Sequence, residues 1–169
     1  MSATWGPATS SSRLQAARPP RESMMPEAKT GLDLLLVEDD SSVAAMYALV
    51  LMEAGHDVRV SFDGRSALQS AKRRTPHLVL VDVRLPDLDG FTVVERLREL
   101  EDMAAVPVVM LSNYRTPEMT ERGVELGVMA YLLKTDVTPV QLRSRIDAWR
   151  ASQLVGGAPP PPVESLDHA

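Results

Sequence analysis

The sequence contains no cysteine among its 169 residues, so it has no disulfide framework, no thiolate metal site and no thiol nucleophile. Aromatic residues make up only 4 % of the chain, and no apolar run approaches the roughly eighteen residues of a membrane span. The first thirty residues lack the apolar stretch of a secretory signal. Hydrophobic residues still reach 44 %, a normal fraction for a globular domain. We therefore expect a folded cytoplasmic protein without membrane contact.

The prolines mark the expected domain boundaries. Four of the 13 prolines precede residue 31, and four form the run Pro159–Pro162. Residues 1–31 lack sustained apolar periodicity and would bury too little apolar surface to offset the entropy of ordering them. Residues 153–169 combine a Gly-Gly hinge with the proline run. We therefore predict a folded domain over 32–152 between two disordered tails, 1–31 and 153–169.

The charges divide at the same boundaries. Residues 1–31 carry four basic and two acidic side chains, and residues 153–169 carry two acidic ones. The body of the chain therefore holds the whole net charge of −5. An acidic domain repels the phosphate backbone of nucleic acids, so we expect no direct binding of DNA.

Short apolar runs alternate with amphipathic segments through the body of the chain. Near-continuous apolar runs are typical of parallel strands that are covered on both faces. Strict alternation of strands and helices predicts a parallel three-layer α/β sandwich with right-handed crossovers. The expected strands are 32–37, 56–61, 77–82, 106–112 and 130–134, and the expected helices are 41–54, 64–73, 90–101, 117–127 and 138–151.

Several residues have expected structural roles. Ser41 can cap the helix 41–54, in which Met46 falls at the spacing of the buried face, and Thr138 can cap the last helix. For Asp40 we favour a capping role over a role in a site. Asp89-Gly90 is the expected entry to the helix 90–101. His56 and His77 lie at the starts of strands and are not grouped with other potential metal ligands, which favours structural roles. Phe91, Leu97 and Trp149 are expected in the core.

Chemically distinctive side chains follow four of the expected strands. Glu38 and Asp39 end the first strand, Asp82 ends the third, Ser112 the fourth and Lys134 the fifth. Because parallel strands place their carboxyl ends at one edge of the sheet, these groups should converge there. Converging carboxylates repel one another and require protonation or a hard cation. No histidine or cysteine is present at these strand ends, so oxygen-ligated Mg²⁺ is the expected cofactor.

Four motifs surround these strand ends: VEDD at 37–40, VDVRLPDLDG at 81–90, MLSN at 110–113 and AYLLK at 130–134. Through these motifs the body closely resembles the receiver domain of two-component response regulators, over roughly residues 32–152. This resemblance implies a flavodoxin-like sheet with strand order 2-1-3-4-5 and five helices.

The resemblance implies a phosphoacceptor and a metal site. Asp82 would take a phosphoryl group from a phosphohistidine on a sensor histidine kinase or a histidine phosphotransfer protein. Asp39, Asp82 and the backbone carbonyl of Arg84 would hold Mg²⁺, with Glu38 acting through water. The chain would thus be a phosphoacceptor that assists its own phosphorylation and dephosphorylation rather than an enzyme with a separate substrate.

The resemblance also implies a switch. Lys134 and Ser112 would stabilise the phosphoryl group, and Tyr131 would turn inward as Ser112 moves. The altered surface would comprise the helix 117–127, the strand 130–134 and the helix 138–151, and it would bind a downstream protein target.

The sequence departs from the commonest family pattern at three places. Thr135 replaces the proline that usually follows the lysine, so the Lys134–Thr135 bond is expected to be trans, because a non-proline cis bond costs about 2.5–4 kcal/mol. Asn113 stands where a small residue is common, and we expect it to narrow access to the phosphoryl site and so to affect the lifetime of the phosphate. Arg84 and Tyr114 are large, and we expect them to shield the acyl phosphate from water and to prolong its lifetime.

No helix-turn-helix module follows residue 152 in this sequence, which favours a stand-alone, chemotaxis-regulator-like receiver. Two other functions stay open. In the first, Asp82 is a phosphorelay intermediate that passes its group to another histidine. In the second, the chain is a Mg²⁺-dependent aspartyl phosphohydrolase, although that class usually has a second acid where this chain has Arg84. A phosphorylation-dependent dimer is also left open.

Overall fold

The computed structural model describes residues 31–154, which form a single parallel sheet with five helices and one short 3₁₀ helix. The predicted tails, 1–31 and 153–169, lie outside the described residues apart from Gly31, Gln153 and Leu154. The last helix continues to Leu154, two residues beyond the predicted domain end.

The elements alternate as the apolar pattern predicts, and their boundaries differ from the predicted ones by a few residues. They are β1 Asp33–Val37, α1 Ser41–Glu53, β2 Asp57–Ser61, α2 Gly64–Arg73, β3 Leu78–Asp82, α3 Gly90–Arg98, η1 Glu101–Met103, β4 Val108–Ser112, α4 Pro117–Glu125, β5 Ala130–Leu133 and α5 Pro139–Leu154.

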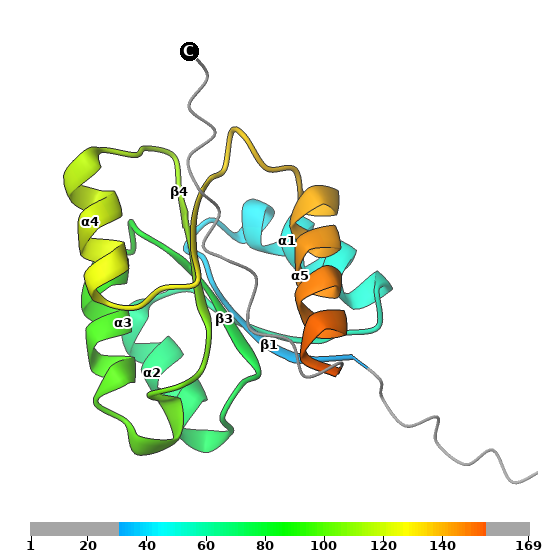
Figure 1. The fold of residues 1–169 in the computed structure, drawn as a ribbon, viewed down its shortest axis with the longest axis horizontal. Coiled ribbons are helices and arrows are strands. Elements are labelled where there is room, and N and C mark those ends of the chain that lie inside the picture. Colours follow the sequence, from blue (N-terminus) through cyan, green and yellow to red (C-terminus); the bar gives the residue numbers. More distant parts are fainter. Residues whose placement is uncertain (1–30, 155–169) are drawn as a thin grey trace, which may run out of the picture.

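The sheet has the order β2-β1-β3-β4-β5, and every neighbouring pair is parallel. This confirms the predicted flavodoxin-like α/β fold. Helices α1 and α5 cover one face of the sheet, and α2, α3 and α4 cover the other (Figure 1). All the carboxyl ends therefore lie at one edge, where the loops to the helices begin. Within residues 31–154, no helix has the length and apolar character needed to cross a membrane.

Two apolar clusters hold the three layers together. Strands β1, β3 and β4 are buried at every position, and their alternate side chains enter opposite faces of the sheet. The cluster under α1 and α5 includes Leu36, Leu142 and Trp149, and the cluster under α2 and α3 includes Phe91 and Leu97. The core positions predicted for Phe91, Leu97 and Trp149 are confirmed.

Helix α1 differs from its prediction in two respects. Its cap is Asp40 rather than Ser41, because the Asp40 carboxylate accepts from the backbone N–H groups of Ser42 (2.8 Å) and Val43 (3.0 Å). The capping role favoured for Asp40 is therefore confirmed. Met46, predicted on the buried face, is 45 % exposed. The helix is apolar on most of its circumference, so periodicity alone does not identify the buried face.

Gly90 brings the start of α3 against the end of β3. A side chain at this position would collide with the backbone carbonyl of Asp82 and the Cα of Val83. Its N–H donates to the carbonyl of Val83 at 2.8 Å, and Asp89 caps the helix, as predicted for the Asp89-Gly90 pair. The loop that follows Asp82 is thereby held close to the strand.

Candidate functional site

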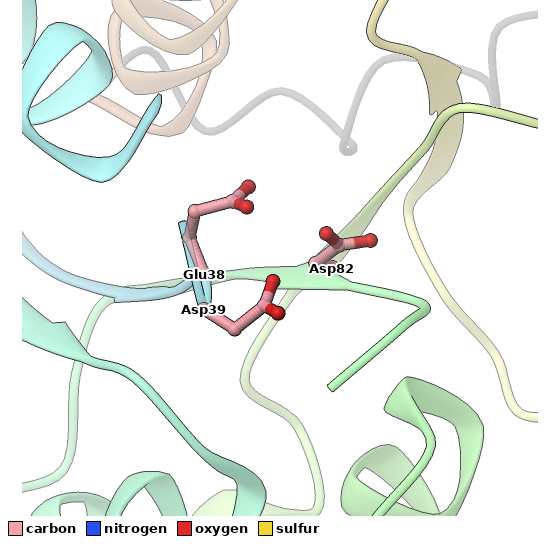
Figure 2. Close-up of side chains that lie close together, drawn as sticks. All are labelled: Glu38, Asp39 and Asp82. Atoms are coloured by element: carbon pink, nitrogen blue, oxygen red, sulfur yellow. The ribbon is translucent and has the colours of Figure 1, made fainter. Parts of the chain in front are cut away.

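Three carboxylates gather at the carboxyl ends of the two central strands. Glu38 and Asp39 follow β1, and Asp82 is the last residue of β3, which pairs with β1 in the sheet. One oxygen from each carboxylate lies within 4.8 Å of the others (Figure 2). Glu38 and Asp82 are buried, whereas Asp39 is exposed. The cluster is therefore open to solvent on the side of Asp39 and enclosed on the other.

Lys134 joins the cluster from the end of β5. Its Nζ donates to Oδ2 of Asp82 at 2.6 Å and to Oε2 of Glu38 at 2.5 Å. Residues 31–154 contain no cis peptide bond, so the Lys134–Thr135 bond is trans, as expected. The trans bond still allows the ammonium to reach the carboxylates. The contact with Glu38 was not predicted from the sequence.

The electrostatics of the cluster favour a further positive charge. Burial raises the pKa of Glu38 above its usual value, against the opposing hydrogen bond and charge of Lys134. Burial alone would lower the pKa of Lys134, but its bonds to Asp82 and Glu38 outweigh that effect and raise it. With Lys134 charged, three carboxylates and one ammonium leave a formal charge of −2 when all three acids are ionised. A divalent cation would neutralise that charge.

The loop after β3 positions Asp82 and the neighbouring helix. The N–H of Arg84 donates to Oδ1 of Asp82 at 3.1 Å, while Oδ2 faces Lys134. Asp87 in the same loop accepts from the N–H groups of Gly64 (2.8 Å) and Arg65 (3.0 Å) at the start of α2. These partners are more than twenty residues away in sequence. Local spacing in the sequence therefore gives no signal for this role of Asp87.

Ser112 and the loop after β4 form the second side of the cluster. Ser112 is buried at the end of β4, and its Oγ accepts from the N–H of Tyr114 at 3.1 Å. The hydroxyl of Tyr131 donates to the carbonyl of Tyr114 at 2.9 Å. The half-buried Tyr131 ring stacks on Phe91, with the ring centroids 6.4 Å apart. The loop after β4 is thus tied to both Ser112 and Tyr131.

The three side chains predicted to tune the lifetime of a phosphate all lie on the rim. Arg84 and Asn113 are exposed, and Tyr114 is 59 % exposed. They belong to the loops that follow β3 and β4, beside Asp82 and Ser112. Residues 83–85 also line, with α3 and α4, a cavity of about 460 Å³ that includes Phe91 and Met119.

The two predicted structural histidines lie away from this cluster. Nδ1 of His56 accepts from the N–H of Leu32 at 3.1 Å, and Nδ1 of His77 accepts from the N–H of Asp33 at 2.8 Å. Each imidazole therefore satisfies a backbone donor near the beginning of β1. The structural roles expected for both residues are confirmed.

The structure is thus a parallel α/β domain with the strand order 2-1-3-4-5 and an acidic pocket. The pocket lies at the carboxyl edge of the sheet, where the carboxylates, a lysine and a hydroxyl are found. Residues 34–147 match the model of the response regulator receiver domain. This chain belongs to that family. Receiver domains accept a phosphoryl group and bind Mg²⁺ at an acidic pocket, and response regulators act with histidine kinases and downstream targets.

Individual proteins agree with this assignment. The chain is 36 % identical over 131 residues to the gliding motility regulatory protein of Myxococcus xanthus, covering 78 % of this chain and 16 % of that protein. The structure of the chemotaxis response regulator CheY4 of Vibrio cholerae has 28 % identity and a TM-score of 0.66, and the match covers 70 % of this chain and 98 % of CheY4. The BeF3-activated N-terminal receiver domain of Klebsiella pneumoniae RstA has 32 % identity and a TM-score of 0.62, with coverages of 68 % and 95 %.

The chain spans less than half of the length of several curated relatives that it matches, including the gliding motility protein. Those relatives include multidomain regulators. The similarity therefore concerns the receiver domain, and the activities of the whole relatives do not follow from it.

Proposed function

We propose that Asp82 is the phosphoacceptor of this receiver domain and that its phosphorylation changes protein binding at the surface formed by α4, β5 and α5. The donor is a phosphohistidine on a sensor histidine kinase or a histidine phosphotransfer protein. The observation that carries the proposal is the position of Asp82, buried at the end of β3 with Oδ2 2.6 Å from the Lys134 ammonium.

The residues at the strand ends fit a bound Mg²⁺. Carboxylate oxygens are the ligands that this hard cation takes in proteins, and three lie within 4.8 Å of one another. Asp39, Asp82 and the backbone carbonyl of Arg84 would hold the ion, and Glu38 would act through water. When bound, the ion would neutralise charge between the carboxylate and the incoming phosphoryl group.

In the transfer step, a carboxylate oxygen of Asp82 attacks the phosphorus atom of the phosphohistidine. A P–O bond forms while the P–N bond breaks, and the imidazole leaves with the electron pair and takes up a proton. Lys134, already beside Asp82, turns its ammonium to the phosphoryl oxygens. Ser112 Oγ accepts from the N–H of Tyr114, which leaves its own O–H to donate to the same group.

The conformational response runs through contacts that already join the site to α4. A move of Ser112 toward the phosphoryl group pulls on Tyr114, whose carbonyl accepts from the Tyr131 hydroxyl. Tyr131 lies on β5, and its hydroxyl is also 3.5 Å from the sulfur of Met119 in α4. Ser112, Tyr114 and Tyr131 therefore couple the acidic cluster to the proposed binding surface.

The exposed side chains on the rim set the lifetime of the acyl phosphate. Arg84 and Tyr114 flank the opening above Asp82 and hinder the attacking water, and Asn113 narrows the same opening. Arg84→Ala and Tyr114→Ala should each lose phosphate faster than the parent protein. Unchanged or slower hydrolysis in both variants would contradict this part of the proposal.

The phosphoacceptor is tested with acetyl phosphate and Mg²⁺, followed by intact-mass measurement and mapping of the modified residue. The parent chain should gain one phosphoryl group on Asp82, and Asp82→Asn should gain none. Asp102→Asn is a matched control, because Asp102 is an exposed aspartate in η1 outside the cluster. Equal phosphorylation of Asp82→Asn and the parent would overturn the proposal.

A further inference from the structure

The loop between β3 and α3 carries the backbone carbonyl of Arg84, which the proposed metal site uses. Backbone hydrogen bonds fix both ends of this loop. The N–H of Val83 donates to the carbonyl of Leu111 at 3.0 Å, and the N–H of Gly90 donates to the carbonyl of Val83 at 2.8 Å. Within residues 31–154, the loop residues 84–88 make no backbone-to-backbone hydrogen bond to another element. The middle of the loop is therefore held by other contacts.

The carboxylate of Asp87 joins the middle of the loop to the start of α2. Its Oδ1 accepts from the N–H groups of Gly64 and Leu88, each at 2.8 Å, and its Oδ2 accepts from the N–H of Arg65 at 3.0 Å. Burial alone would raise the pKa of Asp87, but these N–H groups outweigh that effect and lower the pKa below its ordinary value. The carboxylate is therefore ionised at neutral pH, and charge-assisted bonds of this kind are stronger than neutral ones.

The start of α2 also packs directly against the loop. Gly64 is buried, and a Cβ atom at this position would lie 2.7 Å from Cγ2 of Val93 and 3.0 Å from Cβ of Leu88. Leu88 is half-buried and packs on the apolar cluster under α2 and α3. The first turn of α2, the loop and α3 therefore contact one another without space for a side chain at Gly64, and the loop cannot shift without displacing α2.

We propose that Asp87 is a positioning residue for the metal site. By holding the loop on the start of α2, it fixes the backbone from which the Arg84 carbonyl would reach Mg²⁺. A backbone carbonyl has no side-chain rotamer of its own, so its position depends on the loop that carries it. Groups outside the coordination shell that orient metal ligands contribute about 10–100-fold in metal affinity. The inference rests on the proposed function, because it takes the metal site from that proposal.

Asp63 provides a matched comparison, because it caps the same helix without holding the loop. It is the N-cap of α2, and its Oδ1 accepts from the N–H of Ser66 at 2.7 Å. Replacing either Asp63 or Asp87 by alanine removes one negative charge and at least one backbone acceptor from the same helix end. A purely structural role of Asp87 predicts similar effects of the two substitutions. A positioning role predicts that Mg²⁺ binding changes only when Asp87 is replaced.

Calorimetric titration of the full chain with Mg²⁺, in the absence of any phosphodonor, tests this role. Asp87→Ala should weaken Mg²⁺ binding by about tenfold, the lower end of the range for such groups, whereas Asp63→Ala should bind Mg²⁺ as the parent does. In phosphorylation by acetyl phosphate, Asp87→Ala should need correspondingly more Mg²⁺ for half of the maximal rate, yet reach the parent rate at saturating Mg²⁺. This split between metal requirement and maximal rate distinguishes a displaced metal ligand from damage to Asp82 itself.

Thermal unfolding establishes that each variant is folded at the titration temperature. If Asp87→Ala is not folded, Asp87→Asn takes its place, because it keeps the side-chain size and one acceptor oxygen, and it should still bind Mg²⁺ less tightly than the parent. Equal Mg²⁺ affinity in the Asp87 variant and the parent would overturn the inference, and so would an equal loss of affinity in Asp63→Ala.

Asp39→Asn separates this result from a failure of the proposed function. If Asp39→Asn binds Mg²⁺ as tightly as the parent, the proposed metal site itself is wrong. If Asp39→Asn loses Mg²⁺ binding and the Asp87 variant does not, the metal site stands and the positioning role of Asp87 is refuted. Losses in both variants, with Asp63→Ala unchanged, are the result expected.

Discussion

Helices α3 and α4 have the same length, yet they are attached to the molecule in different ways. Each has nine residues and a side-chain cap, Asp89 in α3 and Thr116 in α4. Helix α3 buries five of its residues, whereas the only buried residue of α4 is Gly123. The two helices lie side by side on one face of the sheet (Figure 1). The two helices therefore have the same length and similar N-terminal caps, but they are packed against the rest of the domain to very different extents.

This difference divides the region around the site into a fixed part and a weakly held part. Helix α3 begins at the loop that holds Asp82, and its Gly90 packs against the end of β3. Helix α4 contacts α3 through Arg122, which pairs with Glu95 of α3 at 2.9 Å and lies 4.7 Å from the centre of the Phe91 ring. An element with few buried contacts opens at a lower free energy than the core, so α4 is suited to move while α3 keeps the site intact.

The largest expected difference between the helices comes from truncating their apolar side chains. Leu97 of α3 is fully buried, so Leu97→Ala should lower the free energy of unfolding by about 2–5 kcal/mol. Val124 of α4 is 69 % exposed, and Val124→Ala should change the free energy of unfolding by no more than about 0.5 kcal/mol. Urea denaturation of both variants measures these values. Similar losses of unfolding free energy in the two variants would show that α3 and α4 contribute equally to stability despite their different burial.

Removing the caps gives a smaller and more local comparison. The Asp89 carboxylate accepts from the N–H of Thr92 at 3.0 Å, and the Thr116 hydroxyl accepts from the N–H of Met119 at 3.3 Å. Asp89→Ala and Thr116→Ala should each cost about 0.5–2 kcal/mol of helix stability. Because α4 is weakly packed, Thr116→Ala should speed hydrogen exchange in α4 alone, whereas Asp89→Ala should lower the unfolding midpoint of the whole domain. The reverse pattern would count against the comparison.

The contacts of Arg122 should have a still smaller effect. Arg122 and Glu95 are each more than 40 % exposed, and pairs of this kind contribute about 0.2–1 kcal/mol. Arg122→Gln should raise the hydrogen-exchange rates of the α4 amides and leave global stability nearly unchanged. Arg96→Gln on the exposed side of α3 is the matched control and should leave α4 unaffected. Faster exchange of the α4 amides in both variants would show that the loss of a positive charge, rather than the loss of the Arg122–Glu95 pair, destabilises α4.

The smallest effect should come from pH, on the opposite side of the sheet. Burial lowers the pKa of His56 below the ordinary histidine value of 6.5, with Arg150 acting in the same direction and Asp147, 3.3 Å from Nε2, opposing it. The unfolded chain therefore binds this proton more readily than the folded chain. The contribution of neutral His56 is complete above pH 6.5 and is lost as the pH falls toward the lowered folded-state pKa.

Urea denaturation between pH 7.5 and 5 measures this dependence. The free energy of unfolding should fall with pH in the parent, and His56→Gln should show a shallower dependence because it removes this group. An equally steep dependence in the variant would assign the effect to other groups. Exchange in α4 should not follow the His56 titration, since Nε2 of His56 lies 3.3 Å from Asp147 of α5, which covers the other face of the sheet.

Residues that act within a short stretch of sequence were predictable from it. The apolar runs gave each strand to within one or two residues, because β1, β3 and β4 are buried on both faces. The gathering of Glu38, Asp39, Asp82 and Lys134 followed from the rule that parallel strands end at one edge. The strand order itself came from the family resemblance.

Features that depend on long-range contacts were not predictable in the same way. The bonds of Asp87 to the start of α2 and of Lys134 to Glu38 join residues far apart in sequence, and neither leaves a local pattern. The exposure of Met46 was missed because α1 is apolar around most of its circumference. The unequal packing of α3 and α4 depends on their position at the sheet, which similar amphipathic sequences do not encode.

Hydrogen exchange of α3 and α4 before and after treatment with acetyl phosphate and Mg²⁺ tests the central claim most directly. Phosphorylation of Asp82 should change the exchange rates of the α4 amides and of the loop after β4, while those of α3 stay constant. The same treatment of Asp82→Asn should change neither helix. A parent protein that shows no change in α4, or equal changes in both helices, would contradict the account.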